Sequence, residues 1–73
     1  MKQVDFHGKT VEEATELFED TINEVRLNKE TREIKLVTGR GAIHKKLVEL
    51  IREYQLEYAV PMANEGQINV VIE

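Results

Sequence analysis

A short strand, a glycine and an amphipathic helix follow one another twice within the first 54 residues of the chain. The first copy alternates apolar and polar side chains over residues 2–6, breaks at Gly8 and continues into a helix that begins after Thr10. The second alternates over residues 33–37, turns at residues 38–41 and continues into another helix. The copies share this order but not their sequence. Two such units predict parallel strands covered by helices.

Both helices have strong sequence signals. Thr10 and Glu13 have the spacing of a capping box, in which each side chain accepts a hydrogen bond from the other residue's backbone N–H. Apolar residues then recur with helical spacing. The expected buried positions are Val11, Ala14, Phe18, Ile22 and Val25 in the first helix, and Ile43, Leu47, Leu50, Ile51 and Tyr54 in the second. The carboxylates of the first helix are expected mostly on a solvated face.

The rest of the chain completes one small sheet. A polar connection at residues 28–31 links the first helix to the second strand. Residues 56–60 predict a third strand that Pro61 stops, and residues 64–66 a turn. Residues 68–72 alternate as a fourth strand, antiparallel to a neighbour. We therefore predict a single domain over residues 1–73 of the α/β class: a two-layer β-α-β-α-β-β sandwich with two helices on one face of a four-stranded mixed sheet.

Composition excludes several classes of protein. The chain has 73 residues, of which 41% are hydrophobic and none is cysteine, so its single core must provide the stability without disulfides. Its longest uncharged apolar run is far shorter than the roughly 20 residues of a membrane span, and its start has no signal-peptide core. We expect an intracellular protein of the cytoplasm or nucleus, not secreted and not in a membrane.

The charge is unevenly distributed. The formal net charge of −4 argues against a general polyanion binder, but residues 39–55 carry four basic against two acidic side chains. These basic residues are Arg40, Lys45, Lys46 and Arg52. His44, Lys45 and Lys46 lie in the first turns of the second helix, where a cation opposes the helix dipole unless an anion is near. This placement is consistent with phosphate binding, and the alternative is that these are ordinary exposed lysines.

The fold predicts that two glycine-containing segments meet at one edge of the sheet. If the strands at residues 2–6 and 33–37 are parallel neighbours, their carboxyl ends share an edge, which brings His7 and Gly8 beside residues 38–41. Both helices begin at that edge, where their unpaired N–H groups and partial positive charge lie. We expect the functional residues there.

Asp5 and His7 are two positions apart on a strand and therefore project to the same side of it. A carboxylate there can orient an imidazole for acid–base catalysis, or share a metal ion or a water molecule with it. The alternative is a histidine that bonds a loop carbonyl beside a solvated aspartate. The spacing leaves both interpretations open.

The turn at residues 38–41 also has two interpretations. Gly39 and Gly41 can serve to allow a positive φ where the strand turns into the helix. They can also let a phosphate approach the backbone while Arg40 binds it with two hydrogen bonds. The turn lacks the spacing of a Walker loop, so nucleoside triphosphate binding is not indicated.

Three motifs together resemble a known family. They are Val4-Asp5-Phe6-His7-Gly8 followed by the capping box, Lys35-Leu36-Val37-Thr38-Gly39-Arg40-Gly41, and Asn64-Glu65-Gly66 before the last strand. Over nearly the whole chain they resemble the Smr (small MutS-related) domain, with its L-D-L-H-G strand end, its T-G-x-G or H-G-x-G turn and its glycine turn before the last strand. Family members often have His where this chain has Thr38. The resemblance implies a fold like the C-terminal domain of the third bacterial translation initiation factor.

The resemblance also implies a function. Smr domains bind DNA or RNA, and several nick or cleave it, which implies a nicking endonuclease, with DNA repair or recombination as its setting. The catalytic candidates are Asp5, His7 and Arg40, and the nucleic-acid-binding candidates are Gly8, Thr38, Gly39, Arg40, Gly41, His44 and Lys45. No dedicated metal site is predicted, because two histidines and no cysteine exclude an all-protein zinc cage. An ion would be Mg²⁺ or Mn²⁺ held by Asp5, water and substrate phosphate.

Two alternatives remain open. The domain can bind nucleic acid without cleaving it, or it can be a protein-interaction domain that uses the acidic first helix against a basic partner. We also expect it to be part of a larger chain or a homo-oligomer.

Overall fold

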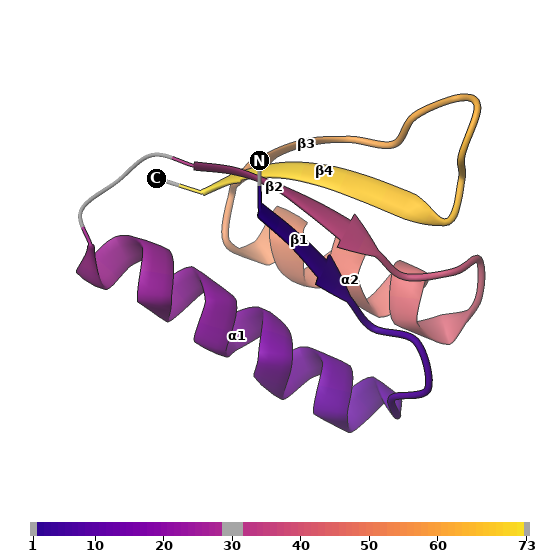
Figure 1. Cartoon of the computed structure of the whole chain (residues 1–73), viewed down its shortest axis with the longest axis horizontal. Coiled ribbons are helices and arrows are strands. Elements are labelled where there is room, and N and C mark those ends of the chain that lie inside the picture. The colour runs from indigo at the N-terminus through magenta and orange to yellow at the C-terminus, as the bar shows by residue number, and fades with distance from the viewer. Residues whose placement is uncertain (1, 29–31, 73) are drawn as a thin grey trace.

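The computed structural model describes residues 2–28 and 32–72. Over these residues the chain forms β1 (Lys2–Asp5), α1 (Val11–Leu27), β2 (Arg32–Val37), α2 (Ala42–Glu53), β3 (Glu57–Ala59) and β4 (Gln67–Ile72) (Figure 1). The predicted β-α-β-α-β-β order is confirmed. Most of the polar connection expected at residues 28–31 lies outside the described residues.

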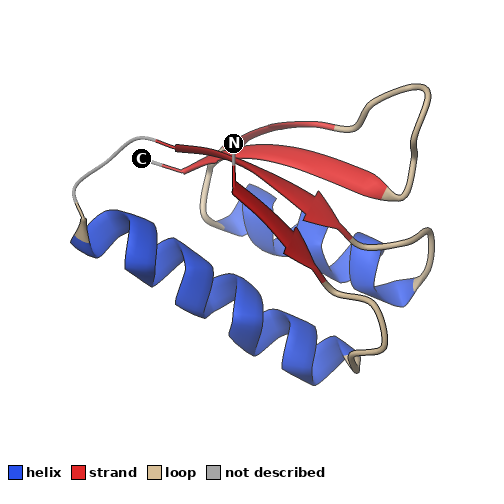
Figure 2. Cartoon of the chain, in the orientation of Figure 1, coloured by secondary structure: helices blue, strands red, loops and turns tan. Residues whose placement is uncertain are grey.

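The four strands form one mixed sheet in the order β1-β2-β4-β3. β1 and β2 are parallel, whereas β4 is antiparallel to both β2 and β3. Both helices lie on the same face of the sheet, which confirms the two-layer α/β sandwich (Figure 2). In the register of β1 with β2, Asp5 lies opposite Val37, so the two strands end at the same edge.

The core lies between the sheet and the two helices. Its fully buried side chains come from both layers and include Phe6, Phe18, Ile34, Leu36, Leu47, Ile51, Ile68, Val70 and Ile72. The rings of Phe18 and Tyr54 stack with centroids 6.1 Å apart, which joins α1 to the end of α2. The Tyr54 hydroxyl donates to a Glu19 carboxylate oxygen at 3.0 Å, and this hydrogen bond raises the pKa of Tyr54.

The capping box at the start of α1 forms as predicted. The Glu13 N–H donates to Thr10 Oγ1 at 3.1 Å, and the Thr10 N–H donates to Glu13 Oε1 at 2.9 Å. These hydrogen bonds with Thr10 lower the pKa of the Glu13 carboxyl group. The carboxylates of Glu12, Glu16 and Asp20 are exposed, as expected for a solvated face.

Two details of the predicted core and sheet are wrong. Val11 was expected in the buried stripe but is 37% exposed, because it is the first residue of α1 and the buried stripe begins at Ala14. The third strand is shorter than residues 56–60. The Leu56 N–H donates back to the Ile51 carbonyl at 3.1 Å, and the ladder with β4 begins at Glu57.

Candidate functional site

The ends of β1 and β2 form one hollow at the sheet edge. Asp5, His7, Val37, Thr38 and Gly39 line it.

 

The hollow's volume is about 170 Å³, which is below the roughly 300 Å³ at which small-molecule pockets begin. The Phe6 N–H donates to the Val37 carbonyl at 2.9 Å, which extends the contact between the two segments beyond Asp5. The structure therefore brings together the two segments that the sequence places at this edge, in a hollow that fits a small group such as a phosphate.

Asp5 holds the backbone of His7 and not its ring. The His7 N–H donates to Asp5 Oδ1 at 2.8 Å, which closes the turn after β1. Gly8 has a φ of +77°, which a residue with a side chain rarely adopts, and so allows this turn. Within residues 2–28 and 32–72, the His7 imidazole has no hydrogen-bond partner and is exposed. The expected contact in which the carboxylate orients the imidazole is absent from this part of the chain.

Thr38 connects the end of β2 to the turn before β4. The N–H groups of Thr38 and Gly39 both donate to the Gly66 carbonyl, at 2.8 and 3.0 Å. The Gly39 N–H is therefore not free to bind a phosphate, and the contribution of Gly39 is its φ of +72°. Gly41 has a negative φ of −104°, so the expectation of a positive φ is confirmed for Gly39 and is wrong for Gly41.

The Thr38 hydroxyl also fixes His44. It lies 2.9 Å from His44 Nδ1, 2.8 Å from the Gly39 carbonyl and 3.2 Å from the Gly66 carbonyl. The hydroxyl has one proton and carbonyls only accept, so these contacts are best satisfied when His44 Nδ1–H donates to the hydroxyl. In the neutral imidazole, Nε2 is then the nitrogen that can accept a proton. Thr38 thus positions a histidine from the next helix.

Arg40 is paired with a carboxylate that the sequence analysis did not assign to the site. Its Nη2 lies 2.9 Å from Glu65 Oε2, and the two side chains are 77% and 61% exposed. Arg40, His44, Val60 and Glu65 line a second hollow of about 400 Å³. The structure therefore divides the expected single site into two hollows. Thr38 connects them, because it lines the first hollow and its hydroxyl contacts His44, which lines the second.

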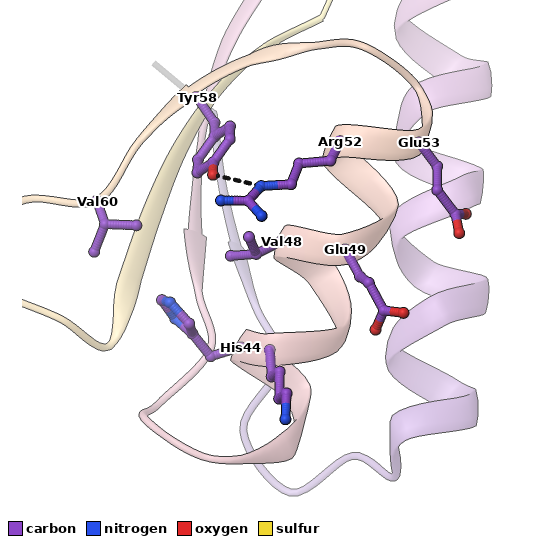
Figure 3. A pocket seen from close by; sticks show the side chains of 8 residues that line it. His44, Val48, Glu49, Arg52, Glu53, Tyr58 and Val60 are labelled. Atoms are coloured by element: carbon purple, nitrogen blue, oxygen red, sulfur yellow. Dashed lines mark hydrogen bonds between the residues drawn. The ribbon is translucent and has the colours of Figure 1, made fainter.

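The N-terminus of α2 is open to an anion. Gly41 is its N-cap, no side chain makes a capping hydrogen bond to it, and its first turn contains no acidic residue. Lys45 is exposed there and, with His44, lines a groove of about 720 Å³ along α2 (Figure 3). The helix end and Lys45 thus add positive potential beside Arg40.

The described residues contain no group of three side chains that could hold a metal ion. Asp5 is the acidic residue that lines the hollow at the strand ends, and its second carboxylate oxygen is not used by the His7 N–H. In the described part of the chain, neither helix is long and apolar enough to cross a membrane.

Comparisons with known proteins bear on the fold. No family model and no curated protein matches the sequence. The crystal structure of the Smr domain of Thermus thermophilus MutS2 is similar with a TM-score of 0.84 and 24% identity, over 100% of this chain and 99% of that chain. The solution structure of the B3BP Smr domain is similar with a TM-score of 0.75 and 20% identity, over 99% of this chain and 78% of that chain. The chain therefore has the fold of the Smr domains, as its motifs imply.

Proposed function

We propose that this domain binds DNA or RNA at the sheet edge and hydrolyses a phosphodiester bond there. The observation that carries the proposal is the meeting of Asp5, His7 and Thr38 around one hollow at the ends of two parallel strands. Arg40 and Lys45 lie beyond Thr38 at the start of α2. The likeness to Smr domains, one of them from MutS2, supports the same proposal.

Binding would use the basic side chains and the helix N-terminus at the sheet edge. The open N-terminus of α2, Lys45 and Arg40 attract a phosphate, and Arg40 can bind two of its oxygens once it leaves Glu65. The net charge of −4 limits the long-range attraction of nucleic acid. We therefore expect weak binding that falls steeply with salt concentration.

Cleavage would use His7 as the acid–base residue. Its exposed imidazole takes a proton from a water molecule as the water oxygen attacks phosphorus. The bond from phosphorus to the leaving oxygen breaks, and that oxygen takes a proton from solvent. Arg40 offsets the negative charge that develops on the phosphate oxygens. The second Asp5 oxygen suits Mg²⁺ or Mn²⁺, with water and substrate phosphate as further ligands, and such an ion would polarise the phosphate.

The test is a nicking assay on supercoiled plasmid and on structured RNA, with Mg²⁺ or Mn²⁺. His7→Ala is expected to lower cleavage by about 100-fold or more, the usual contribution of an acid–base residue. Asp5→Asn keeps an oxygen that can accept from the His7 N–H but removes the negative charge. It therefore separates the structural role of Asp5 in the turn from its role in the reaction. Glu16→Gln, on the exposed face of α1, is the matched control for a lost carboxylate. Equal cleavage by wild type and His7→Ala would refute the catalytic role.

A second candidate, a binding module without catalysis, is favoured by one observation. Asp5 bonds the His7 backbone, so the imidazole lacks the carboxylate partner that would orient it. Binding that depends on Arg40 and Lys45 but not on His7, without strand scission, would select this function.

A further inference from the structure

A groove runs along α2 beside β3 and the residue that follows it. Its apolar lining comes from Val48 on α2 and Val60 after β3, together with the Tyr58 ring (Figure 3). Its volume of about 720 Å³ lies in the range of pockets that enclose small molecules. Val60 is 36% exposed and Tyr58 is half-buried, so the groove offers apolar surface to a ligand.

The groove adjoins the hollow that Arg40 lines, because His44 and Val60 line both. A ligand with a phosphate near Arg40 can therefore reach into the groove. Along α2, Lys45 and Arg52 are about 10 Å apart at 1.5 Å per residue. The groove therefore has basic side chains towards both ends and an apolar middle.

Arg52 and the acidic side chains that line the groove lie on different sides of α2. Arg52 Nε donates to the Tyr58 hydroxyl at 3.1 Å, which turns the guanidinium towards β3 and restrains the ring. Glu49 and Glu53 leave α2 on the opposite side, away from Tyr58 and Val60 (Figure 3). The side of the groove that faces β3 is thus positive, although both signs line it.

We propose that this groove holds an unpaired base of a single-stranded nucleic acid whose backbone is bound at Arg40 and Arg52. The inference rests on the proposed binding function and specifies its ligand. A flat base fits an apolar slot beside a tyrosine ring, and phosphates fit basic side chains on either side. A base in a duplex is stacked and paired, so it must leave the helix before its face can enter the groove. The domain therefore prefers single strands or unpaired loops to duplex.

Fluorescence anisotropy with a labelled single-stranded oligonucleotide and its matched duplex tests the proposal at one low salt concentration. Wild type is expected to bind the single strand about 10-fold more tightly. Tyr58→Ala and Val60→Asp should weaken single-strand binding by about 5-fold or more, the usual effect of losing one stacked base. Tyr58→Phe keeps the ring and should retain the preference. Arg52→Gln should weaken binding, whereas its neighbour Glu53→Gln should not.

Val60→Asp guards against a folding artefact, because Val60 is exposed and outside the strands. Amide chemical shifts on titration with the oligonucleotide should change along α2 and at residues 58–60. If Arg40→Ala abolishes binding while Tyr58→Ala and Val60→Asp do not affect it, the groove proposal is wrong and the proposed function stands. If neither single strand nor duplex binds, both fail. Shift changes confined to α1, or caused by a peptide and not by the oligonucleotide, would also overturn the groove proposal.

Discussion

The ion pair between Arg40 and Glu65 should compete with phosphate for the guanidinium. Glu65→Gln removes the carboxylate charge and leaves a side chain of similar size. Arg40 is then free to bind a phosphate without first breaking the pair, so affinity for nucleic acid should rise.

The size of the effect follows from the exposure of the pair. The two side chains are 77% and 61% exposed, so solvent screens the 2.9 Å contact. Such pairs contribute about 0.2–1 kcal/mol, which corresponds to a paired-to-free ratio of roughly 1.4 to 5. Arg40 is then free in about 40% to 15% of molecules, and removing the competition should tighten binding about 2- to 6-fold.

The assay is fluorescence anisotropy with a labelled single strand at low and at high salt. Glu16→Gln removes the same charge from the exposed face of α1 and corrects for the change in net charge. The gain of Glu65→Gln over Glu16→Gln should fall in the range above and shrink as salt rises. The free energy of unfolding should fall by less than about 1 kcal/mol.

A double-mutant comparison tests whether the gain in affinity comes from the release of Arg40. In an Arg40→Ala background, Glu65→Gln should give no gain beyond that of Glu16→Gln. A gain of equal size without Arg40 would show a general charge effect, and no gain in the wild-type background would show that the pair does not compete. Either result refutes the explanation.

Three further predictions concern the frame around the site. Thr10→Ala removes a partner from the capping box and should lower the free energy of unfolding by about 1 kcal/mol in urea denaturation, and an unchanged midpoint would contradict this. Gly39→Ala places a side chain at a φ of +72° and should cost about 1–2 kcal/mol in the same assay. The hydrogen bond to Glu19 raises the pKa of Tyr54. The stability that this hydrogen bond contributes is therefore fully present below the tyrosine pKa of the unfolded chain, and it is lost as the pH rises through the pKa of the folded chain. Glu19→Gln should lower the Tyr54 pKa in an ultraviolet titration, and an unchanged titration curve would contradict the assignment.

Local patterns and a rule about strand connections were enough to predict the fold. The capping box depends on residues three apart, and the helical stripes and strand alternation are equally local. The parallel pairing of β1 and β2 needs a crossover connection, which α1 provides, and it places the two glycine segments at one edge. Val11 was misplaced because periodicity does not reveal where a helix first meets the sheet.

The contacts within the site could not be predicted from the sequence. Spacing placed Asp5 and His7 on one side but did not reveal that the carboxylate would accept the backbone N–H. Thr38 and Gly66 are 28 residues apart, and their contact depends on how the loop before β4 returns to the edge. Glu65 was visible as part of a turn, but its pairing with Arg40 depends on the same return.

The position of β4 has a consequence for synthesis of the domain. It is the last strand in sequence, yet it lies between β2 and β3 and hydrogen-bonds to both. Until it has emerged from the ribosome, β3 has no partner in the sheet and the core lacks Ile68, Val70 and Ile72. The sheet and core are therefore expected to become stable only after nearly all of these residues have been made.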